Sequence, residues 1–480
     1  MSLKQKTVSG IFWSFIDTFA GQGIQFLTGI VLARILSPRE FGLIGMIAVF
    51  IAVSESFINS GFGSALIRKK DCTQNDFSTV FYFNMTAGLV VFLLLYFLAP
   101  VISNFFDEPA LKPIVQVFGL VLLIDSLSLI QKTLLIKRID FKLQARISII
   151  ASVGSGIIAI GMAWSGFGVW SLVVQRLSRQ TLISVFMWLW NTWRPIAVFS
   201  KKSFRELFGF GSKLMISGLI DTLYQNIYYL VIGKFFSAQE LGYYTRADQF
   251  KTLPSQNLTA IISRVSYPVL SGIQDDKARL KTNYQKLIRG IMLITFVLMM
   301  GMAAVAEPMI ITLIGEKWRP AVVYLQMLSF VGMFYPLNAL NLNMLQVMGR
   351  SDLFLKLEII KKTLALPIIL VGIFLGIKLM IAGMILNSMI AWYINSYWSG
   401  HLIGYSFRQQ VKDILPAFAL GLSMALIVYL IGRILILTPA WTLVIQVTAG
   451  AIYVFLMSEL VKFPDYIFIK DIILERRKAL

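Results

Sequence analysis

Charged side chains stand in the middle of long apolar stretches of this sequence. The positions are Asp17, Asp125, Arg176, Arg179, Asp221 and Lys251. At the centre of a membrane helix, an ionisable side chain costs at least about 2.5 kcal/mol, so each needs a function or a partner. Arginine forks match phosphate oxygens and lysine supplies a point charge. The sequence therefore predicts a basic cavity that holds an anionic ligand.

Other polar residues recur at helical spacing beside these charges. Asp17, Gly21 and Gln25 are four residues apart and predict one polar stripe on an apolar helix, and a second stripe contains Asp221 and Gln225. We expect both stripes to face the space between two lobes of the protein. The residues expected to bind substrate in the cavity are Arg176, Arg179, Arg246, Lys251, Gln25, Tyr224, Gln225 and Asn226.

Two further roles are predicted for charged residues of the spans. Asp17, Asp221 and Asp125 are candidates for coupling to a proton or sodium gradient. Lys213 and Arg264 lie near the expected cytoplasmic ends of their helices, as a cytoplasmic gate or as interfacial anchors. The alternative for all the buried charges is that they pair with each other and hold helices together. The sequence leaves both interpretations open.

The elements that must position these residues are transmembrane helices. The chain has 480 residues, 57% of them hydrophobic, and contains about fourteen stretches near the roughly 20 residues that a span needs. They are 10–35, 41–66, 79–103, 113–136, 145–165, 168–190, 207–235, 241–270, 285–306, 318–347, 356–376, 380–401, 411–436 and 440–461. The fold class is thus an all-α, multi-pass membrane protein.

Composition argues against several kinds of site. The chain has one cysteine, Cys72, and one histidine, His401, so it offers neither an internal disulfide nor a zinc-ligand cluster, and we expect no metal, cofactor or catalytic residue. The net charge of +20 is mainly a topology signal. With the N-terminus in the cytoplasm, about 35 of the 44 Lys and Arg residues fall on the cytoplasmic side, so both termini are predicted there and no nucleic-acid partner is expected.

The two halves of the chain resemble each other. The segment from Arg34 to Gly42 matches Lys234 to Gly242, with Ser, Glu and Gly recurring 200 residues later. Two weaker matches follow the same order. We therefore predict two six-helix lobes, 1–206 and 207–410, related by a parallel repeat, followed by two additional helices and a cytoplasmic tail in 411–480.

Several motifs resemble those of a known transporter family. They are Gly29 to Gly42, Gly61 to Arg68, Tyr243 to Asp248 and Ser263 to Ser271. These segments are similar to the Wzx-like, especially WzxC-like, polysaccharide flippases of the multidrug/oligosaccharidyl-lipid/polysaccharide (MOP) superfamily. The resemblance implies a MATE-like fold in the bacterial cytoplasmic (inner) membrane. It also implies a lipid-linked oligosaccharide substrate, usually on undecaprenyl diphosphate, moved from the cytoplasmic to the periplasmic leaflet.

The expected function is therefore a flippase for surface polysaccharide biosynthesis (O-antigen, capsule or exopolysaccharide) that works by alternating access. Its expected partners are the lipid-linked oligosaccharide, the membrane, a glycan polymerase and glycosyltransferases. Three rivals remain: a multidrug/cation antiporter of the same fold, a membrane glycan polymerase or ligase, and a scaffold for the glycan assembly machinery. The outer connectors are too short for the catalytic loops of a polymerase, and we expect the lining to be too basic for a cationic drug.

Overall fold

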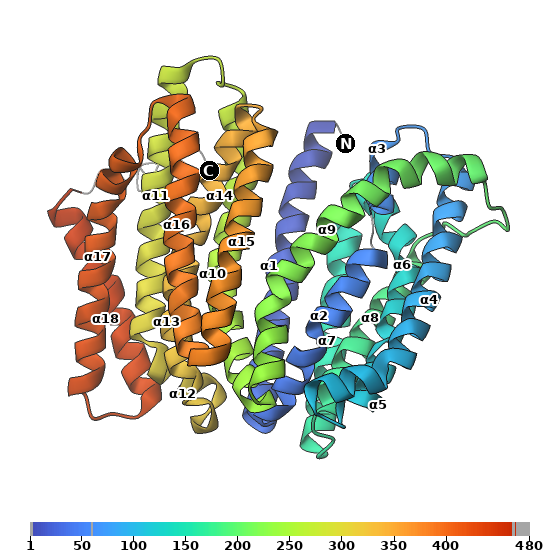
Figure 1. Cartoon of the computed structure of the whole chain (residues 1–480), viewed down its shortest axis with the longest axis horizontal. Helices are drawn as coiled ribbons and strands as arrows, with labels where there is room; N and C mark the ends of the chain where they lie inside the picture. Colours follow the sequence, from blue (N-terminus) through green and yellow to red (C-terminus); the bar gives the residue numbers. More distant parts are fainter. Residues whose placement is uncertain (1–2, 59–60, 463–465, 467–480) are drawn as a thin grey trace. The chain divides into compact units, whose positions relative to one another are not determined.

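The computed structural model describes residues 3–58, 61–462 and 466, and every regular element in these residues is a helix (Figure 1). Contacts along the chain divide it into two compact units, Met1–Gly242 and Tyr243–Leu480. The helices that begin in the first unit are α1 (Leu3–Ile35), α2 (Pro38–Ile58), α3 (Phe62–Arg68), α4 (Gln74–Phe106), α5 (Leu111–Phe118), α6 (Leu120–Lys137), α7 (Phe141–Trp164), α8 (Trp170–Trp190), α9 (Lys201–Phe235) and α10 (Ala238–Ser271). Those that follow are α11 (Lys277–Ala304), α12 (Ala306–Ile314), η1 (Glu316–Trp318), α13 (Ala321–Met333), α14 (Tyr335–Val347), α15 (Ser351–Leu375), α16 (Ile377–Ile403), α17 (Phe407–Ile434) and α18 (Pro439–Leu460).

The predicted spans coincide with helices or helix pairs in the described part of the chain. Ten of them are long and apolar enough to cross a membrane by length and composition: α1, α2 with α3, α4, α5 with α6, α7, α11, α13 with α14, α16, α17 and α18. The other predicted spans correspond to α8, α9, α10 and α15, which carry more polar and charged residues. The all-α membrane fold is confirmed, whereas the crossing of these four helices stays a prediction.

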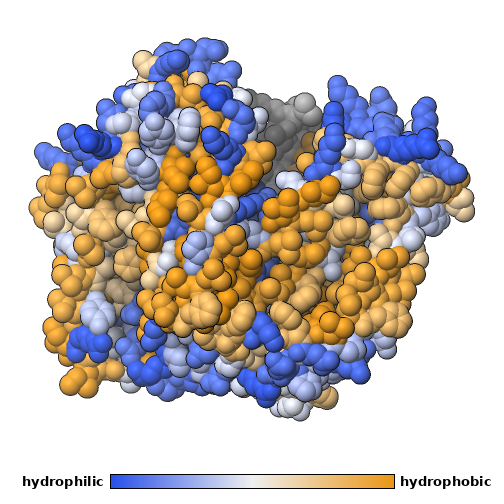
Figure 2. Space-filling model, viewed as in Figure 1, coloured by the Kyte–Doolittle hydropathy of each residue, from blue (hydrophilic) through white to orange (hydrophobic). Residues whose placement is uncertain are grey.

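Apolar side chains cover the outer faces of the helices. Phe97 and Phe374 are 72% and 79% exposed, and Ile157 is 68% exposed, although each lies within a long helix. On the face shown in Figure 2, hydrophobic residues cover the middle of the helices of each unit and hydrophilic residues gather at the helix ends. A soluble protein rarely exposes apolar patches of that extent, so these surfaces face lipid.

The repeated motif is a helix start. Helix α1 ends at Ile35 and α2 begins at Pro38, and α9 and α10 repeat this break at Phe235 and Ala238. In the first copy, the Glu40 carboxylate accepts from the Ser37 amide (2.6 Å) and hydroxyl (2.9 Å). In the second copy, the Ser237 hydroxyl accepts from the Glu240 amide (3.1 Å). Both sets of bonds belong to the Ser-x-x-Glu capping box, which explains why Ser and Glu recur.

Glycines allow the two breaks to pack against each other within the first unit. A Cβ atom on Gly42 would lie 1.6 Å from the Ala238 carbonyl oxygen, and one on Gly242 would lie 1.9 Å from the Pro38 carbonyl oxygen. Any side chain at either position would therefore overlap backbone atoms, which is why glycine recurs at the end of the motif.

Helix α9 packs with the helices that precede it in sequence. Near its start, Glu206 accepts from Lys69 (3.0 Å), and Gly211 lies against Gly61. The contact-based boundary after Gly242 thus differs from the repeat-based boundary after residue 206. The first division reflects contacts in the structure and the second reflects the repeat in the sequence. The lobes 1–206 and 207–410 stay a prediction.

The additional helices α17 and α18 are part of the second unit. Helix α17 contributes Ile414, Ala417 and Leu420 to a large apolar core with residues of α11, α14 and α16. Gln410 of α17 also lies in a fully buried polar network, where it donates to the Asn341 side chain (3.0 Å) and accepts from the Trp392 indole (3.1 Å). Residues 463–465 and 467–480 of the predicted cytoplasmic tail lie outside the described residues.

Candidate functional site

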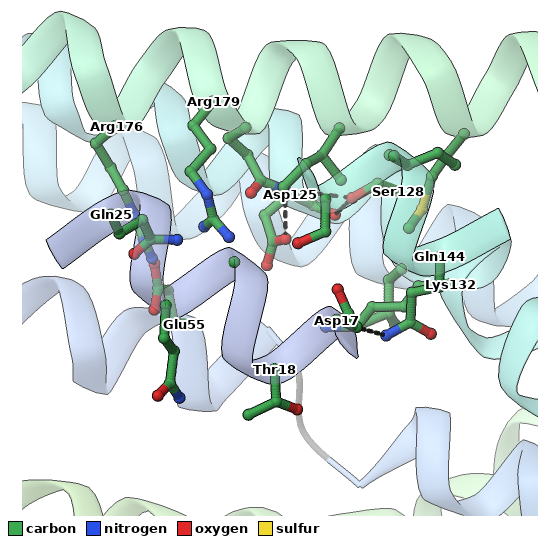
Figure 3. A pocket seen from close by; sticks show the side chains of 18 residues that line it. Asp17, Thr18, Gln25, Glu55, Asp125, Ser128, Lys132, Gln144, Arg176 and Arg179 are labelled. Carbon is green, nitrogen blue, oxygen red and sulfur yellow. Dashed lines mark hydrogen bonds and ion pairs between the residues drawn. The ribbon is translucent and has the colours of Figure 1, made fainter. Parts of the chain in front are cut away.

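A polar cavity of about 400 Å³ lies inside the first unit. Helices α1, α2, α6, α7 and α8 form its walls, and its lining is rich in charged and amide side chains (Figure 3). The lining residues are Asp17, Thr18, Gly21, Gln22, Gln25, Glu55, Asp125, Ser128, Leu129, Lys132, Gln144, Ile147, Ser148, Arg176, Arg179, Gln180, Ile183 and Met187.

Helix α1 presents the predicted polar stripe to this cavity. Asp17, Gly21 and Gln25 all line it, because residues four apart share one helix face. The Asp17 carboxylate accepts from the Gln144 side chain on α7 (3.0 Å). The residues that line this cavity all belong to the first unit, and the expectation that the stripe faces the space between two lobes stays a prediction. Polar partners on α7 and α8 of the same unit satisfy the stripe there.

Helix α8 places two arginines in the cavity wall, and their partners differ. Arg176 forms an ion pair with Glu55 of α2 (2.7 Å). Arg179 reaches the Gln25 amide on α1, whose oxygen, when it faces the donor-only guanidinium, lies 3.0 Å from Nε and 2.8 Å from Nη2. Figure 3 shows both guanidinium groups extending from α8 toward α1. One arginine is thus neutralised by a carboxylate, and the other is held by a neutral amide.

The third polar group of the cavity lies on α6. The Asp125 carboxylate accepts from the Gln180 amide of α8 (2.6 Å), which also reaches the Ser128 hydroxyl (3.3 Å). Lys132 lies two turns further along α6 and also lines the cavity. Spacings of three and four residues put Asp125, Ser128 and Lys132 on one face of α6.

The lining is balanced in charge. Its carboxylates are Asp17, Glu55 and Asp125, and its cations are Lys132, Arg176 and Arg179. In this cavity the charges balance because Glu55 pairs with Arg176. The predicted cavity also includes Arg246 and Lys251 of the second unit, and its net basic charge stays a prediction. The ion-pair alternative therefore applies to Arg176 at 2.7 Å, whereas Arg179 has amide and hydroxyl partners.

Several predicted binding residues do not line this cavity. Arg246 and Lys251 lie on α10 in the second unit. There Lys251 forms an ion pair with Asp248 (2.7 Å), with 14% and 18% of the two side chains exposed, and Arg246 donates to the Gln249 side chain. Their role in substrate binding stays a prediction.

The predicted residues of α9 also lie away from the cavity lining. Asp221 and Gln225 are exposed on that helix, and Asn226 donates to the Thr222 carbonyl (2.8 Å). The other residues of this set outside the lining are Tyr224, the gate candidate Lys213 on α9 and the gate candidate Arg264 on α10.

Among the lining residues that sequence reasoning missed, Glu55 and Gln144 bond directly to predicted ones. Glu55 is the one acidic residue inside the predicted second span, and Gln144 precedes the predicted fifth span by a single position. A lone acid in an apolar span was a usable signal for Glu55, because such a residue needs a basic partner. Gln144 gave no comparable signal, since an amide at a helix end is common and its partner Asp17 is far away in sequence.

The chain is similar to known proteins of polysaccharide biosynthesis. A family model described as polysaccharide biosynthesis protein matches residues 31–323. The chain is 27% identical over 444 residues to the lipopolysaccharide biosynthesis protein WzxC of Escherichia coli (strain K12). The aligned region covers 91% of this chain and 89% of WzxC.

Solved structures show the same fold. The lipid II flippase MurJ in an inward closed conformation has a TM-score of 0.76 at 17% identity, covering 96% of this chain and 100% of MurJ. An inward-facing multidrug resistance MATE family transporter of the MOP superfamily has a TM-score of 0.59 at 15% identity. The match covers 82% of this chain and 98% of the transporter. The predicted MATE-like fold is thereby confirmed.

Proposed function

The chain belongs to the polysaccharide biosynthesis protein family, and from that premise we propose that it is a flippase for a lipid-linked oligosaccharide. It moves the substrate from the cytoplasmic to the periplasmic leaflet of the bacterial inner membrane, by alternating access and with both termini in the cytoplasm. Undecaprenyl diphosphate is the proposed lipid carrier, and the glycan is destined for a surface polysaccharide. The protein acts as a transporter and not as an enzyme, beside a glycan polymerase and glycosyltransferases.

The observation that carries this proposal is the combination of guanidinium and amide groups in one cavity. Arg176 and Arg179 lie one turn apart on α8 and suit the oxygens of a diphosphate. Gln25, Gln144 and Gln180 supply donors and acceptors that suit sugar hydroxyls. Arg246, Lys251, Tyr224, Gln225 and Asn226 are proposed as further contacts that the substrate meets along its path, and Lys213 and Arg264 as the cytoplasmic gate.

Two of the predicted coupling acids lie in the same cavity. Asp17 and Asp125 each accept a hydrogen bond from a glutamine amide. Protonation of either carboxylate would weaken this hydrogen bond, because a neutral carboxyl group is a poorer acceptor. We place coupling to a proton or sodium gradient on these two residues, with Asp221 on α9 as a third candidate. An inside-negative potential by itself favours outward movement of an anionic headgroup by about 2.3 kcal/mol per charge per 100 mV.

The direct test measures the substrate in cells. Polyprenyl-diphosphate-linked oligosaccharide and surface glycan would be quantified with and without the gene, and the leaflet of the precursor would be probed. Precursor that accumulates in the cytoplasmic leaflet while surface glycan disappears supports the proposal. Precursor that accumulates in the periplasmic leaflet indicates a polymerase or ligase instead and contradicts it.

One finding favours a second candidate function. Because the cavity holds three carboxylates, its lining does not repel cations as the sequence had suggested, and a MATE family transporter shares the fold. A multidrug/cation antiporter is therefore the alternative. Unchanged precursor and surface glycan, together with altered tolerance of cationic drugs in the deletion strain, would favour it over the flippase.

A further inference from the structure

The ion pair between Arg176 and Glu55 occupies the place where an anionic headgroup would bind. It joins α8 to α2 at 2.7 Å, and both residues line the cavity. The pair is not sealed in the protein interior, because 40% of the Arg176 side chain and 26% of the Glu55 side chain remain exposed. A ligand in the cavity can therefore reach Arg176, but it meets a carboxylate that already holds the guanidinium.

Arg179 provides an internal comparison. It lies one turn further along α8, and it forms hydrogen bonds with the neutral Gln25 amide and the Ser152 hydroxyl (3.4 Å). An anion that approaches Arg179 displaces a dipole, whereas an anion that approaches Arg176 must displace a full negative charge. The two arginines thus differ in how readily they accept a phosphate group.

The charges that line the cavity cancel each other. With three carboxylates and three cations in the lining, the empty cavity has no net attraction for a diphosphate. If Glu55 moves away from Arg176, that arginine is left beside the headgroup with its charge uncompensated. A partly buried guanidinium is less stable without a counter-charge, so the cavity favours having either Glu55 or a ligand at that position.

We propose that Glu55 is an exchangeable counter-ion: it neutralises Arg176 in the empty cavity, and the diphosphate of the substrate takes its place. This inference rests on the proposed flippase function. Glu55 then lowers the affinity for the headgroup, because it competes for Arg176. It also allows the empty transporter to return without an unpaired arginine, so it speeds turnover.

Binding to the purified full-length protein tests the competition. The probe is farnesyl diphosphate, a short prenyl diphosphate, and binding is measured by calorimetry in detergent for wild type, Glu55→Gln, Arg176→Gln and the double variant. We expect Glu55→Gln to lower Kd about tenfold, which corresponds to about 1.4 kcal/mol. Arg176→Gln should raise Kd. In the Arg176→Gln background, Glu55→Gln should lower Kd by much less than tenfold, because Glu55 has lost its ion-pair partner and acts on Arg179 only through space.

Matched controls separate competition from general effects. Glu108→Gln breaks an Arg–Glu pair of similar length (2.8 Å, to Arg39) outside the cavity lining, and it should leave Kd unchanged. If Glu55→Gln lowers the melting temperature, Glu55→Asp retains the charge but shortens its reach, and it should give a Kd between those of wild type and Glu55→Gln.

The possible results distinguish the inference from the function on which it rests. If Arg176→Gln weakens binding but Glu55→Gln weakens it too or leaves it unchanged, Glu55 is a structural partner and the inference is wrong while the flippase stands. If neither Arg176→Gln nor Arg179→Gln affects binding of the diphosphate, the proposed headgroup site itself is wrong. Turnover gives an independent readout, since Glu55→Gln should bind more tightly yet flip substrate more slowly in cells.

Discussion

At the scale of single residues, the geometry of Arg179 determines what can replace it. Two of its nitrogens face one amide oxygen of Gln25, and lysine offers only a single charged nitrogen. We expect Arg179→Lys to reduce flipping by tenfold or more although the charge is retained. Surface glycan in a deletion strain complemented with the variant measures the effect. Arg408→Lys, at an exposed position on α17, is the matched control, and equal loss in both variants would contradict a specific role for Arg179.

The cavity shows which residue-scale features the sequence could predict. The stripe of Asp17 and Gln25 and the pair Arg176 and Arg179 were evident, because charged residues in apolar helices are costly and follow helical spacing. Their partners were not, because the Arg176–Glu55 contact joins residues 121 positions apart and depends on how α2 packs against α8. Whether the cavity residues bind substrate stays a prediction.

A pH dependence is expected at Lys69, in the connection between α3 and α4. Lys69 lies between two spans and donates to Glu206 (3.0 Å) and Asp76 (3.2 Å). These bonds raise the pKa of Lys69 above 10.5, and the bond to Glu206 contributes most. A raised lysine pKa gives stability that is present below pH 10.5 and is lost as the pH rises through the raised value. Glu206→Gln should therefore cost under about 1 kcal/mol at neutral pH, since the Glu206 side chain is 54% exposed.

The measurement compares melting temperatures of wild type and Glu206→Gln from pH 8 upward. The difference should shrink above pH 10.5, when Lys69 loses its charge in the wild type. Glu316→Gln is the control, because its partner Arg319 keeps its charge over this pH range. The hydrogen bond to Glu316 raises the pKa of Arg319 further above its ordinary value. A Glu206→Gln difference that persists at high pH as it does in the control would rule out the Lys69 linkage.

At the scale of helices, the two matched breaks are constrained by glycine. A methyl group on Gly42 or Gly242 would overlap a backbone carbonyl oxygen of the opposite break, and backbone cannot yield as a flexible side chain can. Overpacking costs about 1–3 kcal/mol or more. Gly42→Ala and Gly242→Ala should therefore each lower the melting temperature and the yield of folded protein.

Gly161→Ala is the control for these substitutions. Gly161 lies within α7 with no atom within 4 Å of the added Cβ atom, and alanine favours helix over glycine by about 1 kcal/mol. This variant should be as stable as the wild type or more so. If Gly42→Ala and Gly242→Ala behave like Gly161→Ala, the close packing of the two breaks is not present in the protein.

The helices themselves were largely predictable, and the deviations have local causes. The predicted span 318–347 is interrupted where α13 ends at Met333 and α14 begins at Tyr335, directly before Pro336, which lacks the amide hydrogen needed to continue a helix. The short helix α12 was not predicted, because its nine residues continue the apolar pattern of α11 without a polar boundary. Periodicity locates apolar stretches, but it does not resolve such breaks within them.

At the scale of the whole molecule, the number of membrane crossings depends on whether the polar helices span the bilayer. Hydropathy supports ten spans among the described residues, and α8, α9, α10 and α15 are more polar. Polar helices cross a membrane when other helices shield their charges. For α8 this shielding is visible, since its arginines and Gln180 bond to α1, α2, α6 and α7. We therefore predict that all four helices cross, which gives fourteen spans and two cytoplasmic termini.

Single cysteines test this topology, because Cys72 is the one native cysteine of the chain and can be replaced by serine. New cysteines are placed at exposed residues that flank the four polar helices, and an impermeant maleimide is applied to spheroplasts before and after permeabilisation. The sites expected to react from outside are Ser165→Cys, Ser237→Cys and Lys378→Cys, and those expected to react only after permeabilisation are Lys201→Cys, Asp275→Cys and Ser351→Cys.

Each polar helix is tested by the pair of sites on its two sides. Helix α8 lies between residues 165 and 201, α9 between 201 and 237, α10 between 237 and 275, and α15 between 351 and 378. Labelling of residues 165 and 201 from the same side would mean that α8 does not cross, and Arg176 and Arg179 would then lie outside the membrane. A cavity for a lipid-linked headgroup requires those arginines at depth, so this result would overturn the topology and the proposed site together.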